Sequence, residues 1–156
     1  MEYQVKAAFL YKFCGYVEWP AQAFVQIDSP ISIGVIGSTA LTDALSKITT
    51  GHTVNGRAII VRKIQRGDSI SGLHILFVTG SNVGRDSETL LNARGQPVLI
   101  VTEEDQLPPP DSMINFVLVN DKVRFDIALQ PAEQSSLKIS ARLLAVARKV
   151  IPRPSS

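Results

Sequence analysis

Few side chains in this sequence combine the type and the spacing that enzyme or metal chemistry requires. The two histidines, His52 and His74, fall in different segments and have no carboxylate at ligand spacing, so we predict no metal site. His74 lies in the apolar run 73–78, which favours a hydrogen-bonded structural histidine over a ligand. The single cysteine, Cys14, also lies in an apolar run, where we expect a buried, inert thiol. No nucleophile motif such as Gly-x-Ser-x-Gly is present, and we predict no catalytic residue.

A turn that could hold a phosphate follows the first β-branched run. Residues 34–39 read Gly-Val-Ile-Gly-Ser-Thr and lead into an amphipathic helix, whose first backbone amides are free to contact an anion. The turn lacks the third glycine of a dinucleotide-binding motif and the Lys-Ser/Thr pair of a P-loop. We therefore expect Ser38 or Thr39 to cap the helix. Gly37 and Ser38 remain candidate ligand-binding residues, and an enzyme acting on a phosphorylated substrate is the least favoured function.

Three charged residues occupy positions where an anionic ligand or a partner's carboxylate could interact. Glu103 begins an acidic run directly after an apolar strand, at the edge where open α/β sheets bind ligands. Arg57 follows a glycine at the start of a predicted strand, and Arg124 alternates with Asp126 along another. Cross-strand ion pairs would explain the arginines, and a solvated turn would explain the acids. With these alternatives open, we name Arg57, Glu103 and Arg124 as candidate ligand-binding residues.

These side chains must be positioned by alternating strands and helices. Apolar and β-branched runs predict strands at 31–36, 58–64, 73–79, 97–102, 113–119 and 122–129. Helical spacing predicts helices at 3–19, 41–48, 86–93 and 140–150. The dipeptide Asn120-Asp121 indicates a tight antiparallel hairpin, whereas the earlier strands are expected to be parallel, even across the short link 65–72. The predicted fold is α/β, a three-layer α/β/α sandwich with a mostly parallel sheet of about six strands and a C-terminal antiparallel hairpin.

The length of 156 residues suits one domain, which we place at 1–151, followed by a disordered tail at 152–156. The net charge of +2 is far from the clustered positive charge of a nucleic-acid binder, so we predict no nucleic-acid partner. Hydrophobic residues make up 45% of the chain and charged residues only 19%, below the roughly 25% of ordinary soluble domains. This imbalance indicates more apolar surface than one small core readily covers.

The excess of apolar side chains concentrates in the predicted helix 3–19, which is apolar nearly all round. Such a helix is normally buried nearly all round, and this one precedes the sheet instead of linking two strands. It is therefore the element most free to contact another molecule, and we predict a partner or homodimer interface on it. The expected interface residues are Phe9, Leu10, Phe13, Tyr16, Val17 and Trp19.

Stretches spread over nearly the whole chain resemble, in the same order, the YfiR-like family, which is catalogued under a domain of unknown function. The opening stretch 3–13 is followed by Val-Glu-Trp-Pro at 17–20, and Gly-His-Thr-Val-Asn-Gly-Arg occupies 51–57. Further similar stretches are 73–78, 97–102, 113–116 with 123–127, and 137–144. The positions that match the family pattern best are Lys6, Phe9, Glu18, Trp19, Pro20, Arg57, Arg124, Phe125 and Ser140.

The resemblance implies a non-enzymatic periplasmic regulator without a cofactor, working as a homodimer. Its expected partner is a membrane-anchored diguanylate cyclase or other signalling protein. The resemblance implies that the regulator represses this partner by binding its extracytoplasmic domain. Release of the repression raises cyclic di-GMP and favours biofilm. We expect a cleaved leader peptide, absent from this sequence. Leu73 stands where relatives often have cysteine, so redox sensing through an internal disulfide is not carried over. The alternative function is a sensor for a small anionic ligand, which could control partner release.

Overall fold

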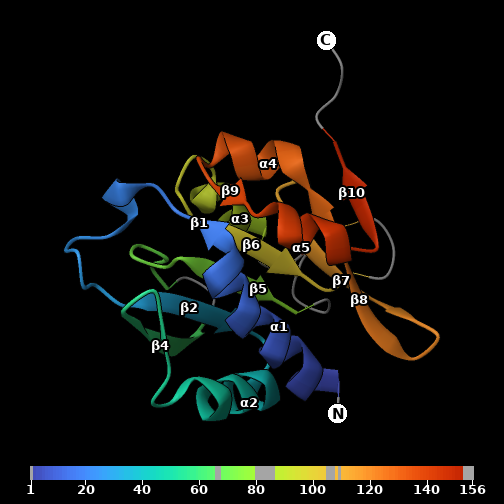
Figure 1. Cartoon of the computed structure of the whole chain (residues 1–156), viewed down its shortest axis with the longest axis horizontal. Helices are drawn as coiled ribbons and strands as arrows, with labels where there is room; N and C mark the ends of the chain where they lie inside the picture. The colour runs from blue at the N-terminus through green and yellow to red at the C-terminus, as the bar shows by residue number, and fades with distance from the viewer. Residues whose placement is uncertain (1, 66–67, 80–86, 105–107, 109, 153–156) are drawn as a thin grey trace.

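One mixed sheet organises the chain, as the computed structural model in Figure 1 shows. The structure describes residues 2–65, 68–79, 87–104, 108 and 110–152. Within these ranges, no helix has the length and apolar character needed to cross a membrane.

Helices and strands are interspersed along the chain. The helices are α1 (Glu2–Tyr16), α2 (Thr39–Thr49), α3 (Ser87–Ala93), α4 (Leu129–Gln134) and α5 (Ala141–Val146), with a short 3-10 turn η1 (Ala21–Ala23). The strands are β1 (Val17–Glu18), β2 (Ile31–Ile36), β3 (Thr53–Val54), β4 (Arg57–Ile64), β5 (Ile75–Val78), β6 (Leu99–Thr102), β7 (Ile114–Val119), β8 (Lys122–Ala128), β9 (Lys138–Ile139) and β10 (Lys149–Ile151). In the described residues, β3, β4 and β5 follow one another without a helix between them.

The main sheet has the strand order β10-β8-β7-β6-β5-β2-β4-β3. The strands from β4 through β2, β5 and β6 to β7 run parallel, whereas β7–β8 and β3–β4 are antiparallel hairpins. The predicted α/β class, the mostly parallel sheet and the terminal hairpin are therefore confirmed. The sheet has eight strands in the described part of the chain, and not about six, because β3 and β10 extend its two edges.

The parallel centre is held by strands that are apolar on both faces. Every residue of β5 and β6 is buried, as expected for strands covered from two sides. On one face, Phe77 of β5 contacts Phe116 of β7, which packs against Phe9 and Phe13 of α1. This aromatic cluster attaches α1 to the middle of the sheet.

Two hairpin turns adopt a left-handed backbone, and the one at Asn120-Asp121 is predicted from the sequence. Asn120 and Asp121 have φ angles of 52° and 64°, and Asn55 and Gly56 have φ angles of 52° and 79°. Two successive positive φ values twist a two-residue turn in the same sense as its strands. The Asn-Asp and Asn-Gly dipeptides thereby set the register of β7–β8 and of β3–β4.

Two predicted helices end earlier than their patterns indicate. The helix predicted at 3–19 ends at Tyr16, because Val17 and Glu18 pair as a strand with Ile139 and Lys138. The prediction of a helix over 140–150 is wrong beyond Val146. There Arg148 donates its backbone N–H to the carbonyl of Phe125 at 2.8 Å, and β10 joins β8 in parallel.

Candidate functional site

The expected interface on α1 is smaller than its sequence suggests. Leu10 and Phe13 are fully buried and Val17 is 5% exposed, all within this chain's own core. These three residues have no surface left for a partner, which corrects their assignment to an interface. Phe9 and Trp19 are half-buried and Tyr16 is 38% exposed, so only these members of the expected set reach the surface.

A buried ion pair attaches the first turns of α1 to the sheet. The ammonium group of Lys6, a residue only 3% exposed, is paired with the carboxylates of Glu2 and of Glu103, which follows β6. Burial lowers the pKa of Lys6, but the hydrogen bonds and charges of Glu103 and Glu2 outweigh burial, and the pKa is raised. Glu103 is thus occupied by an internal partner.

The segment between α1 and β2 is fixed to the amino edge of the sheet by His74. The backbone N–H of Ser32 donates to Nδ1 at 3.0 Å, so Nε2 carries the proton and donates to the carbonyl of Ala23 at 2.9 Å. Trp19 donates its indole N–H to the His74 carbonyl at 2.9 Å. Burial lowers the pKa of His74, the hydrogen bond to Ala23 opposes this shift, and the charge of Arg57 adds to it. The predicted structural histidine is confirmed.

Arg57 and Phe24 continue this arrangement on the same segment. The ring of Phe24 stacks on His74 with centroids 4.4 Å apart, and the guanidinium carbon of Arg57 lies 3.5 Å from the Phe24 centroid. Arg57 also donates to the carbonyls of Ser29 at 2.6 Å and Gln26 at 3.4 Å. We call Arg57, Phe24 and His74 the stack. The stack fixes the first half of the loop 20–30 through Ala23 and Phe24 and the second half through Ser29.

At the outer end of this loop two aliphatic side chains lie in solvent. Val25 is 95% exposed and Ile27 is 93% exposed, the highest values among the exposed large hydrophobic residues of the described chain. We call Val25 and Ile27 the apolar tip. The turn between them is fixed by Ser29, whose hydroxyl accepts from the backbone N–H of Gln26 at 2.8 Å. A braced loop that exposes two β-branched residues is the arrangement expected of a contact surface.

The five candidate ligand-binding residues do not converge on one site. Gly37 and Ser38 follow the carboxyl end of β2, whereas Arg57 begins the parallel strand β4 at the opposite edge of the sheet. Arg124 is exposed in the middle of β8, with four strands between β8 and β4. Ser38 is the helix cap, accepting from the N–H of Leu41 at 3.0 Å.

The polar pairing expected on the last strands is found at Asp126 and not at Arg124. The guanidinium group of Arg148 donates to both carboxylate oxygens of Asp126, at 2.8 and 2.6 Å. Cys14 is buried as predicted, and burial raises the pKa of its thiol to about 12. Among the described residues no group of three or more metal-binding side chains occurs.

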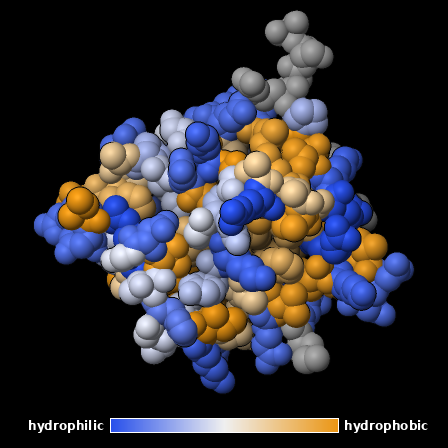
Figure 2. Space-filling model, in the orientation of Figure 1, coloured by the Kyte–Doolittle hydropathy of each residue, from blue (hydrophilic) through white to orange (hydrophobic). Residues whose placement is uncertain are grey.

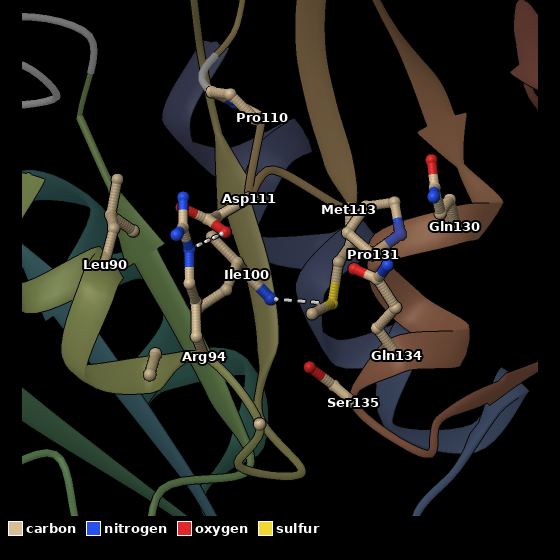
Figure 3. A pocket seen from close by; sticks show the side chains of 12 residues that line it. Leu90, Arg94, Ile100, Pro110, Asp111, Met113, Gln130, Pro131, Gln134 and Ser135 are labelled. Carbon is tan, nitrogen blue, oxygen red and sulfur yellow. Dashed lines mark hydrogen bonds and ion pairs between the residues drawn. The ribbon is translucent and has the colours of Figure 1, made fainter.

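A separate cavity of about 320 Å³ opens between α3 and α4 (Figure 3). Its floor is apolar and includes Leu90, Ile100 and Met113, with the N–H of Ile100 donating to the Met113 sulfur at 3.4 Å. Gln134 extends over this floor from the α4 side in the view of Figure 3. The volume lies at the lower end of the range of small-molecule pockets.

One ion pair forms the wall of this cavity opposite α4. Arg94 donates from Nε to Asp111 at 2.7 Å, and Asp111 precedes β7. Within the described residues the two terminal nitrogens of Arg94 make no further hydrogen bond, so both can donate to an anion. The site was not apparent from the sequence, because Arg94 and Asp111 are 17 residues apart and neither belongs to a motif.

The outward side of α1 forms a shallow apolar hollow of about 350 Å³ lined by Val5, Ala8 and Phe9 with Gln4 and Lys12. Figure 2 shows hydrophobic side chains gathered on the face that α1 and α5 share. Val5 is 42% exposed and Val146 of α5 is 58% exposed. Of the residues predicted to form an interface on α1, Phe9 lines this hollow.

The apolar tip is the feature that the sequence interpretation missed. Val25 and Ile27 lie in an eleven-residue segment bounded by Pro20 and Pro30 that shows no helical or strand-like repeat. Apolar residues in such a segment are the available signal, because a loop has no core side that would bury them.

Comparison with known sequences gives one result. The sequence model of the YfiR/HmsC-like family matches residues 3–148, which is nearly the whole chain. No protein of curated function matches.

Proposed function

This chain belongs to the YfiR/HmsC-like family, and we propose that it is a non-enzymatic periplasmic regulator that binds the extracytoplasmic domain of a membrane-bound diguanylate cyclase or a related signalling protein. The family supports the general role of a regulator of cyclic di-GMP signalling. An exposed apolar surface of the described residues supports the proposed contact with a partner.

The observation that carries this proposal is the apolar tip. Val25 and Ile27 are almost fully exposed, while the loop beneath them is fixed by the stack and by Ser29. Exposed aliphatic side chains gain free energy only when another molecule covers them, about 1.5–3 kcal/mol for each side chain fully buried. Because the loop is already ordered, little conformational entropy is lost on binding.

Repression would follow if the tip entered an apolar cavity of the partner and held that domain in its inactive arrangement. The hollow on α1 around Phe9 offers a second surface for the same partner or for a second copy of the chain. We propose that a homodimer, if formed, uses this hollow on α1.

Replacing both tip residues tests the proposal. We expect the double variant Val25→Ser, Ile27→Ser to lose repression while keeping the melting temperature of the parent, because neither side chain contributes to the core. Exposed Leu91→Ser on α3, away from the tip and from the hollow on α1, is the matched control and should keep repression. A tip variant that represses as the parent does would exclude the tip as the contact.

A second candidate function is a sensor for a small carboxylate, and the free terminal nitrogens of Arg94 favour it. The terminal nitrogens would donate to the carboxylate while its apolar body lies on Leu90, Ile100 and Met113. Because Asp111 balances the charge of Arg94, this binding would rest on hydrogen bonds and apolar contact, not on net charge. Hexanoate should raise the melting temperature and hexanol should not.

The Arg94→Gln variant should lose this stabilisation, whereas Arg148→Gln, at an exposed arginine that is likewise paired with an aspartate, should retain it. If millimolar hexanoate and benzoate leave the melting temperature of the parent unchanged, the cavity is not a carboxylate site.

A further inference from the structure

The outer edge of β4 is open over most of its length. β4 spans Arg57–Ile64 and pairs with β2 on one side from Ile59 to Ile64. On the other side, the described strand β3 covers only Arg57 and Ala58. In the part of the chain that the structure describes, every second residue of 59–64 therefore directs unpaired backbone N–H and C=O groups outward, along about 20 Å of edge. Figure 1 shows β4 at this margin of the sheet.

Side chains along the open edge are apolar at its centre and basic at its end. Ile60 is 43% exposed, and Arg62 and Lys63 are both exposed. β4 carries no acidic residue. Lys63 donates to the hydroxyl of Thr39 at 2.8 Å, which directs its ammonium group toward the start of α2.

The two cations determine which strand can be added. An edge strand bearing lysine or arginine resists pairing with a copy of itself, because copies bring like charges to the same short contact. A six-residue edge also buries far less than the roughly 1,000 Å² that a stable dimer requires. The same cations attract carboxylates, and they favour a strand of opposite charge.

We propose that the open edge of β4 binds an extended acidic segment of a partner protein as an added strand. Main-chain hydrogen bonds to residues 59–64 provide the affinity. An apolar side chain of the segment lies beside Ile60, and carboxylates lie beside Arg62 and Lys63. The segment continues the line of β3 and begins where Thr53 ends its pairing with Ala58. This inference rests on the proposed regulatory function, because it describes a second contact with that partner.

The test uses a blocked peptide of about nine residues, the length that spans such an edge. It carries valine at most positions and two adjacent glutamates opposite Arg62 and Lys63, because these two neighbouring side chains face opposite sides of the sheet. Its counterpart carries lysine in place of glutamate. Fluorescence anisotropy should show binding of the acidic peptide that weakens at high salt, and at least tenfold weaker binding of the basic peptide. Hydrogen exchange should show that the acidic peptide slows exchange of amides in residues 59–64 and leaves β10, at the other edge, unchanged.

A charge reversal provides the matched variant. Arg62→Glu with Lys63→Glu should weaken the acidic peptide at least tenfold and strengthen the basic one, whereas Arg142→Glu with Lys149→Glu should change neither affinity. Absence of binding, equal binding by the reversed variant, or protection elsewhere than residues 59–64 would overturn the proposal. Failure of the regulatory function is measured separately, by the cyclic di-GMP content of cells, and does not depend on this peptide.

Discussion

Buried polar residues decide how the surface of this protein is presented. Lys6 holds α1 on the sheet through Glu103, and His74 holds the loop that exposes the apolar tip. The sequence pattern correctly predicted His74 as a structural histidine, because a lone histidine in an apolar run needs internal partners. The pattern could not show that Glu103 meets Lys6, since 97 residues separate them and only the packing of α1 brings them together.

At the residue scale, His74 predicts a pH dependence of stability. Its pKa in the folded chain lies below the ordinary 6.5, so the unfolded chain binds a proton more readily. The stability that neutral His74 contributes to the fold is fully present above about pH 6.5 and is lost as the pH falls below that value. The loss is about 1.4 kcal/mol for each unit by which the pKa of the folded chain lies below that of the unfolded chain. Protonated Nδ1 also cannot accept from Ser32.

Urea unfolding of the parent and of His74→Gln, followed from pH 7.5 to pH 5, measures this effect. The free energy of unfolding should fall more steeply in the parent than in the variant. Arg57 lies against Phe24 in the stack and its charge lowers the pKa of His74, so Arg57→Gln should reduce the slope in the parent background without removing it. Identical slopes for parent and His74→Gln would show that His74 does not control stability in this range.

At the element scale, strands with strong local signals were predicted well, whereas the short strands β1, β9 and β10, which form only by pairing with distant segments, were not. β2 matches its predicted range because its β-branched run is bounded by Pro30 and Gly37. The error over 140–150 arose because alanine and leucine favour a helix locally. Pairing of β10 with β8, supported by Arg148 on Asp126, stabilises a strand there instead.

Two glycines give a matched prediction for element packing. A Cβ atom on Gly34 of β2 would lie 2.8 Å from Ile64 and Leu73 side-chain atoms, so Gly34→Ala should destabilise by about 1–3 kcal/mol. A Cβ atom on Gly15 of α1 would lie 3.7 Å from Val54, an ordinary contact, and Gly15→Ala should stabilise by about 0.5–1 kcal/mol. Chemical denaturation of both variants measures these changes. Equal effects at the two positions would contradict the close packing of β2.

At the scale of the whole molecule, the apolar excess of the composition has two destinations. Most of it lies in the core, including Leu10, Phe13 and Val17 of the predicted interface. The sequence could not separate these from exposed residues, because a helix apolar all round does not indicate which of its sides its own sheet covers. The remainder lies on the surface, at the apolar tip and around the hollow on α1.

This division gives the regulator a rigid body with a small projecting contact. The stack attaches the projecting loop to the sheet, and Lys6 attaches α1 to the same sheet. A partner bound to the apolar tip would therefore be connected to the whole domain. The open edge of β4 would add a second, electrostatic contact. Two modest contacts on one rigid body bind more strongly than either alone.

The most direct test of this account is the cyclic di-GMP content of cells of the source organism that lack the gene. These cells should contain more cyclic di-GMP than the parent strain. Re-introducing the gene, or its Leu91→Ser variant, should restore the low level, and the Val25→Ser, Ile27→Ser variant should leave it high although the protein accumulates normally. A deletion without effect on cyclic di-GMP, or full restoration by the tip variant, would contradict the account.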